Sequence, residues 1–275
     1  MDHWIFEYES AIRLSCFFGI FALMALLETR FPRLAYNVKP IRGIRWLNNI
    51  SLAIIASIIT RIILPISLIS FAIYCQTAAL GLFNQDVFAH SNSILIFIIS
   101  LILFDFIIYW QHRIFHKIPI LWRLHKVHHS DKAFDVSTGI RFHPLEILVS
   151  IAIKFSVVWV FGLPAESIIV FEVMLNALAL FNHSNVKIPL AIDYYLRMLV
   201  VTPDMHRVHH SQIPTETNSN YGFNISLWDR IFGSYQDQPS LGHDNIEIGL
   251  KDFIDSDEPK HLITMLTMPF KSSTK

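Results

Sequence analysis

Long apolar runs separated by short polar stretches dominate the pattern of this chain. Five runs have about the length that an α-helix needs to cross a bilayer: residues 11–27, 50–72, 94–110, 147–163 and 165–181. Arg61 and Pro65 interrupt the second run and Lys154 interrupts the fourth, so we expect these two crossings to be tilted, kinked or partly packed against protein. Gly162 and Pro164 predict a tight reversal between the last two runs.

The composition indicates a membrane protein. Of the 275 residues, 53% are hydrophobic and 16% are charged, which is too apolar for an ordinary soluble domain. The net charge of zero gives no electrostatic support for a nucleic-acid partner. Cys16 and Cys75 lie in apolar surroundings, so we expect neither a disulfide framework nor a thiolate metal site. The first apolar run follows an acidic N-terminus, which predicts a retained anchor rather than a cleaved signal.

The distribution of Lys and Arg predicts an orientation. The loop between the first two runs contains five basic residues, whereas residues 73–93 contain none. The positive-inside rule therefore places that first loop in the cytoplasm, the N-terminus outside and the C-terminus in the cytoplasm. The sequence predicts an all-α fold, a multi-pass membrane helical bundle with a cytoplasmic, histidine-rich metal-binding cap. We expect N-terminal membrane helices in 1–93, a catalytic region in 94–240 and a polar C-terminal tail in 241–275.

Eight of the 14 histidines gather in three short clusters, all on the predicted cytoplasmic side. Separations of three and four residues on a helix bring side chains onto one face, so each cluster can direct several imidazoles at one point. Imidazole suits Zn, Cu, Fe and Ni, and eight ligands exceed the needs of one ion. The pattern therefore predicts two transition-metal ions held by these residues: His112, His116, His125, His128, His129, His206, His209 and His210. His3, His90, His243 and His261 are given no role.

The clusters read "HRIFH" at 112–116, "HKVHH" at 125–129 and "HRVHH" at 206–210. Together with "RFHPLE" at 141–146, "NHSN" at 182–185 and "NYGFNISLWDRIFGSY" at 220–235, they resemble the membrane fatty acid hydroxylase/sterol desaturase superfamily. The resemblance runs from about Asp105 to Tyr235. Members bind two metal ions, physiologically iron, and hydroxylate or desaturate C–H bonds of lipids.

The resemblance implies ligand roles for the eight clustered histidines and makes His183 a ninth ligand. It leaves His143 as a ligand, as a residue that orients a ligand by hydrogen bonding, or as a packing residue at a helix start. Asp105 is an acid inside an apolar run, on one helical stripe with Tyr109, His112 and His116. We expect Asp105 to support a metal ligand, against the alternative of a carboxylate that pairs helices near the interface.

The predicted function is that of an O₂-dependent di-iron lipid monooxygenase or desaturase. Zn could replace Fe on purification, because imidazole binds both. No GxGxxG fingerprint is present, so electrons are expected from a separate cytochrome b5-like or ferredoxin-like protein. A zinc-dependent membrane hydrolase is the first alternative, but none of the three clusters contains an acid to act as a base. A non-enzymatic metal-binding membrane protein is the second. The lipid itself, whether sterol, fatty acyl chain or related compound, is left open.

Overall fold

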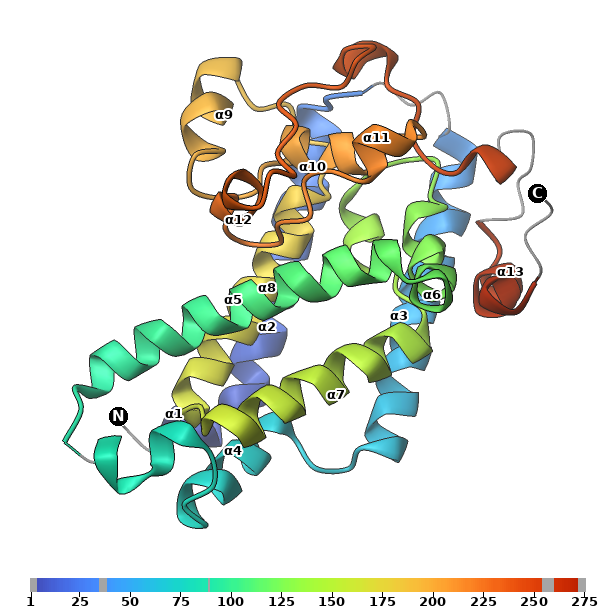
Figure 1. Ribbon diagram of the computed structural model, residues 1–275. Helices are drawn as coiled ribbons and strands as arrows, with labels where there is room; N and C mark the ends of the chain where they lie inside the picture. Colours follow the sequence, from blue (N-terminus) through green and yellow to red (C-terminus); the bar gives the residue numbers. More distant parts are fainter. Residues whose placement is uncertain (1–3, 35–38, 89, 254–259, 272–275) are drawn as a thin grey trace.

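Helices are the only regular elements in residues 4–34, 39–88, 90–253 and 260–271, which the computed structural model describes (Figure 1). The long helices are α2 (Glu9–Arg30), α3 (Lys39–Ile63), α4 (Leu68–Thr77), α5 (Ser93–Lys117), α7 (Pro144–Phe161) and α8 (Ala165–Asn182). Short helices connect or cover them: α1 (Trp4–Glu7), η1 (Leu82–Asn84), η2 (Asp86–Phe88), α6 (Pro119–His129), η3 (Val136–Ile140), α9 (Leu190–Leu196), α10 (Pro203–His209), α11 (Pro214–Thr217), α12 (Leu227–Ile231), η4 (His243–Asn245), η5 (Lys251–Phe253), α13 (Leu262–Thr267) and η7 (Met268–Phe270).

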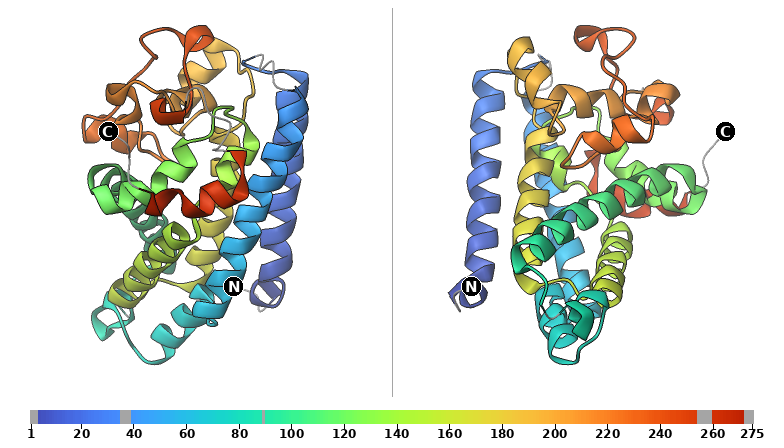
Figure 2. Two further views of the ribbon diagram at one scale, coloured as in Figure 1. Left: turned by 90° about the vertical axis from the view of Figure 1, so that its right-hand side faces the viewer. Right: turned by 60° about the vertical axis from the view of Figure 1, so that its left-hand side comes forward.

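The five predicted crossings are confirmed as helices long and apolar enough to span a membrane. They are α2, the α3–α4 segment, α5, α7 and α8. Helix α8 is the most enclosed, with 44% of its most apolar stretch buried, whereas only 6% of the corresponding stretch of α2 is buried. Figure 2 accordingly shows α2 at the edge of the bundle. One face of α2 packs against α8, whereas apolar side chains on its other face, such as Leu14, Phe18 and Leu26, are exposed, as expected for a helix that faces lipid.

The second crossing is broken where its proline predicts a break. Helix α3 ends at Ile63, and α4 begins at Leu68, after a non-helical stretch that contains Pro65. Proline lacks the N–H that would continue the backbone ladder. The Ser67 side chain accepts a hydrogen bond from the Ser70 N–H at 3.0 Å and so starts the new helix. Helix α4 then packs against both α7 and α8.

Helices α7 and α8 form the predicted hairpin. Gly162 ends α7 with φ of +65°, a left-handed conformation that glycine adopts without strain. A Cβ on Gly81 would lie 2.2 Å from the Gly162 backbone nitrogen, so the loop after α4 can approach the hairpin only because Gly81 has no side chain. This hairpin returns the chain to the end of the bundle where the histidines lie (Figure 1).

A polar cap, defined here as residues 118–143 and 183–253, covers that end of the bundle. Basic residues of the first loop and of α3 tie the cap to the membrane helices. Arg33 pairs with Asp204 at 3.2 Å and with Asp244 at 2.7 Å, and the buried Arg45 pairs with Asp131 at 2.6 Å. Positive charges that indicated orientation in the sequence therefore also have structural partners in the cap.

The expected membrane orientation can be tested by cysteine labelling. The segment that leads into α5 lies at the end of the bundle opposite to the cap (Figure 1), and its residue Ser91 is exposed, as is Thr215 on α11 of the cap. In a variant without Cys16 and Cys75, we expect Ser91→Cys to react with an impermeant maleimide only from outside and Thr215→Cys only from the cytoplasm. The opposite result would refute the orientation; labelling of both from one side would refute the arrangement of the crossings. Ser272, a further labelling position at the C-terminus, lies outside the described residues.

Candidate metal centre

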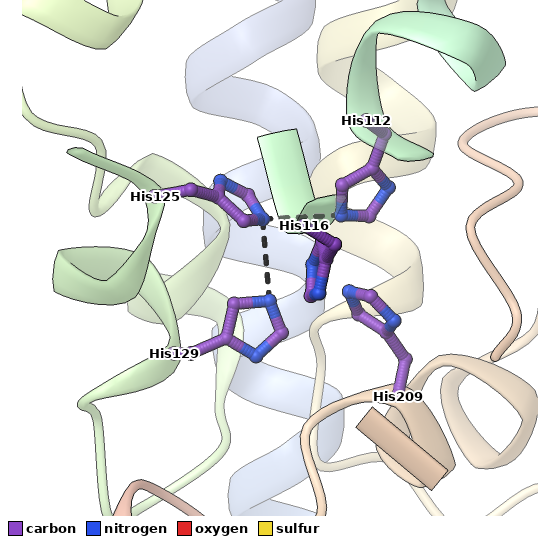
Figure 3. A group of neighbouring side chains, drawn as sticks. All are labelled: His112, His116, His125, His129 and His209. Carbon is purple, nitrogen blue, oxygen red and sulfur yellow. Dashed lines mark hydrogen bonds between the residues drawn. The ribbon is translucent and has the colours of Figure 1, made fainter. Parts of the chain in front are cut away.

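Nine histidines meet where the cap joins the membrane helices. They come from α5, α6, the residue that ends α8, and α10 with the residue that follows it. Their ring nitrogens form two groups, and within each group one nitrogen of every histidine lies within 4.8 Å of the others. Figure 3 shows the rings of the first group directed at a common centre. Its members are His112, His116, His125, His129 and His209, and those of the second group are His128, His183, His206 and His210.

The local sequence explains the division into two groups. Neighbouring residues on a helix point about 100° apart. In α6, His129 therefore joins the first group and His128 joins the second. At the end of α10, His209 joins the first group and His210 joins the second. Each HxxHH cluster thus contributes to both groups, which holds the two groups side by side.

The nitrogens within each group are close. His125 Nε2 lies 3.1 Å from His112 Nε2 and 3.2 Å from His129 Nε2, as the dashed lines in Figure 3 show. In the second group, His183 Nε2 lies 3.0 Å from the Nε2 atoms of both His128 and His206. A neutral imidazole has one donor and one acceptor. Three converging nitrogens therefore cannot all be satisfied by one another.

The chemistry of this donor set fits a metal ion in each group. Among the described residues, both groups consist of histidine alone, and both ring nitrogens of His210 are buried without a hydrogen-bond partner. Burial lowers the pKa of His183 and of His209 to about 3. These imidazoles are therefore neutral at pH 7, which is the form that binds a metal. Metal ions would also satisfy nitrogens that otherwise lack partners.

Groups outside the centre hold several rings in place. His112 Nδ1 donates to the Tyr221 carbonyl at 2.8 Å, and His209 Nδ1 donates to the Ser219 carbonyl at 2.7 Å. His125 Nδ1 lies 2.6 Å from the carboxylate of Glu146, which is buried at the start of α7. A proton on Nδ1 leaves Nε2 as the free acceptor directed inward. This is the usual outer support of metal-binding histidines.

In the structure, Asp105 and His143 form hydrogen bonds with partners outside the two groups. The Asp105 carboxylate accepts from Trp228 Nε1 at 2.8 Å and from the Ile225 N–H at 3.3 Å, so it anchors α12 and the residues just before it. His143 caps α7 by accepting from the Leu145 N–H at 3.2 Å, and its Nε2 donates to the Leu266 carbonyl at 3.2 Å. In the described part of the chain, neither residue hydrogen-bonds to a histidine of the centre.

Two acids that sequence reasoning did not assign to the centre support it. Glu146, the acid at the end of "RFHPLE", contacts His125, as described above. Asp229 accepts from the N–H groups of Tyr221 and Gly222 at 2.7 and 2.8 Å. These hydrogen bonds fix the backbone at residues 221–222, and the Tyr221 carbonyl in turn accepts a hydrogen bond from His112. Asp229, which belongs to the stretch "NYGFNISLWDRIFGSY", thus supports the centre by fixing the position of the Tyr221 carbonyl.

A cavity of about 300 Å³ opens beside the first group. Residues of α2, α3, α5, α7 and α8 line it, and His112 and His125 form part of its wall. Most of the other lining side chains are apolar. Ser57 of α3 and Asn176 of α8 line the cavity and are also exposed, so the cavity reaches the molecular surface within the membrane-spanning part of the bundle. An alkyl chain could therefore approach the histidines from the bilayer.

These features define an integral membrane protein with a buried polyhistidine centre at the end of an apolar cavity. The chain belongs to the fatty acid hydroxylase family, whose model matches residues 97–234, half of the sequence. It is 30% identical over 174 residues to the ornithine lipid hydroxylase OlsE of Rhizobium tropici, which covers 63% of this chain and 50% of that protein. It is 31% identical over 161 residues to human alkylglycerol monooxygenase, covering 56% of this chain and 33% of that protein.

A third relative is the fatty acid hydroxylase vlmA of a Lecanicillium species, 27% identical over 161 residues, or 54% of this chain and 44% of that protein. The chain thus spans half or less of the length of these relatives. No solved structure matches the chain.

Proposed function

We propose that this protein is a membrane-bound di-iron monooxygenase that hydroxylates a C–H bond of a lipid. The observation that carries the proposal is the pair of buried, all-histidine groups, one of which lines an apolar cavity that reaches the membrane-facing surface. The relatives are named as hydroxylases or a monooxygenase, which favours hydroxylation over desaturation. In the balanced reaction, one atom of O₂ enters the C–H bond and the other leaves as water, with two electrons and two protons consumed.

The ligands of this proposal are the nine histidines of the two groups, five for one ion and four for the other. Two iron ions would supply the redox chemistry that activates O₂ for insertion into an unactivated C–H bond. The protein keeps the imidazoles neutral by burial, and Glu146 and the Tyr221 carbonyl fix their rings. The apolar walls of the cavity exclude water and hold the alkyl chain beside His112 and His125.

We propose that a separate cytochrome b5-like or ferredoxin-like carrier delivers the electrons on the cytoplasmic side. The basic first loop is a poor candidate for its docking surface. Arg33 and Arg45 are paired with acids of the cap, and Arg42 is paired with Glu28 at 2.6 Å. Charges that already have close partners attract an acidic carrier less strongly.

The proposal is tested by metal analysis and isotope incorporation. Protein purified under conditions that retain metal is expected to contain close to two transition-metal ions per chain. Iron-loaded protein, given membrane lipids, a reductant and ¹⁸O₂, is expected to yield a lipid that gains one ¹⁸O atom, whereas zinc-loaded protein is expected to be inactive because zinc has no redox chemistry. Full activity with zinc alone would instead indicate the hydrolase, and intact protein with fewer than two metal sites would contradict the di-iron centre.

A further inference from the structure

Helix α7 carries a polar stripe through an otherwise apolar sequence. Glu146, Ser150 and Lys154 are spaced by four residues, which places them on one face of the helix, and all three line the cavity. At 1.5 Å per residue, Lys154 lies about 12 Å along the helix from Glu146, the carboxylate that contacts His125. The cavity therefore has the metal centre at one end and a lysine deep in the membrane part at the other.

Lys154 belongs to a small charge network between three membrane helices. Its Nζ atom lies 3.6 Å from Glu172 Oε1 of α8, while Arg13 of α2 contacts Glu172 Oε2 at 2.9 Å. Arg13 also lies 3.4 Å from Glu9, one turn earlier in α2. The network contains two acids and two bases, so it is neutral as a whole. Lys154 and Glu172 lie within the fourth and fifth apolar runs, where ionisable residues are costly, which makes a functional role the first hypothesis.

The ammonium group of Lys154 is not saturated by this network. Its 3.6 Å separation from Glu172 exceeds hydrogen-bonding distance, and no other residue in the described ranges accepts a hydrogen bond from it. Arg13 neutralises Glu172 from the other side at a shorter distance. The Lys154 ammonium group thus has N–H donors available at the wall of the cavity.

We propose that Lys154 is a specificity-determining residue that binds an uncharged oxygen of the lipid substrate, such as a hydroxyl, ether or ester oxygen. This inference rests on the proposed function for the identity of the occupant as a substrate. With its oxygen held by Lys154, the alkyl chain of the substrate extends along α7 toward His112 and His125. The separation between Lys154 and the metal centre then selects which carbon is oxidised.

The neutrality of the network decides the class of ligand. A carboxylate or phosphate beside Lys154 would add a negative charge inside the membrane with no unpaired positive charge to balance it, which is costly. An uncharged acceptor oxygen gains a hydrogen bond from a charged donor without that cost. The site therefore favours neutral lipids over free fatty acids.

Binding can be measured without turnover, so that failure of the proposed hydroxylation does not affect the result. The photoprobe is a diazirine-bearing dodecan-1-ol, applied to detergent-solubilised protein under nitrogen and located by mass spectrometry of the labelled peptides. Dodecan-1-ol, 1-methoxydodecane, dodecane and dodecanoate compete, each dosed as a mole fraction of the detergent. We expect labelling in α5, α7 or α8 and protection by the alcohol and the ether at about tenfold lower doses than by dodecane.

Lys154→Met keeps the length of the side chain and removes the donors, so it is expected to abolish the difference between alcohol and alkane. Lys187→Met, at an exposed position of the cap, is the matched control and is expected to keep it. If the single variant is unstable, the double variant Lys154→Met/Glu172→Gln replaces it. This variant removes both charges of the pair, and Arg13 keeps Glu9 as its ion-pair partner. Equal protection by alcohol and dodecane in the unmodified protein, an unchanged difference in Lys154→Met, or strongest protection by dodecanoate would each overturn the proposal.

Discussion

Replacing His183 by alanine is expected to remove one of two metal ions and to reduce turnover to background. His183 is fully buried at the end of α8, and its Nε2 lies 3.0 Å from the Nε2 atoms of His128 and His206. Its loss leaves three imidazoles in the second group and opens a hole at its centre. We expect turnover to fall by more than the roughly ten- to hundredfold that is usual when only an outer hydrogen-bond partner of a metal ligand is removed.

The measurement is the number of iron ions per chain together with the turnover of the same sample. His143→Ala is the matched control, because His143 is also buried but its ring contacts Leu145 and Leu266 rather than the two groups. We expect this control to keep both irons and to lose only the stability of a helix cap, about 1 kcal/mol. If His183→Ala retained two irons and normal turnover, His183 would not be a ligand.

Much of this centre could be predicted from sequence because its spacing is local. Histidines four residues apart share a helix face and fall in the same group, whereas those three residues apart are divided between the two groups; long apolar runs fix the crossings. Which histidine joins which group could not be predicted, because it depends on how α6 and α10 face one another. In the structure, α6 and α10 face one another so that His129 and His209 join the first group and His128 and His210 join the second.

The contacts of Asp105 and Glu146 could not be predicted from spacing along the sequence. Asp105 shares a helical stripe with His112, but seven residues correspond to about 10 Å along the axis, so its carboxylate can instead be reached by Trp228 from the cap. Glu146 touches His125 only because α7 packs against α6. Contacts between helices depend on tertiary packing, and no spacing in the sequence encodes them.

The basic first loop illustrates a different limit. Its charges predict orientation through a general rule about membranes, and that rule is silent about partners within the protein. The structure adds that Arg33, Arg42 and Arg45 each face an acid. Those acids are Asp204 near the third histidine cluster, Glu28 at the end of α2 and Asp131 just after the second cluster. These arginines, one in the loop and two at the start of α3, therefore help to hold the chain segments that carry the ligands.

Arg45→Met is accordingly expected to destabilise the fold by about 3–5 kcal/mol, the usual cost of breaking a buried ion pair from one side. Arg45 is 5% exposed and contacts Asp131 at 2.6 Å and also Asp135. Despite burial, the positive charges of Arg45 and Arg141 hold the pKa of Asp131 below its usual value. Without Arg45, two buried carboxylates lose their main counter-charge, directly after the cluster that contains His128 and His129.

The measurement is the free energy of unfolding in a fixed detergent, followed by the iron content of the folded fraction. Arg61→Met is the matched control on the same helix, since Arg61 is exposed, and its effect is expected to stay within about 0.5 kcal/mol. The variant Arg45→Met/Asp131→Asn/Asp135→Asn removes both carboxylate charges together with Arg45, so it is expected to recover part of the lost stability. Equal stability of Arg45→Met and Arg61→Met would show that these ion pairs do not hold the cap on the bundle.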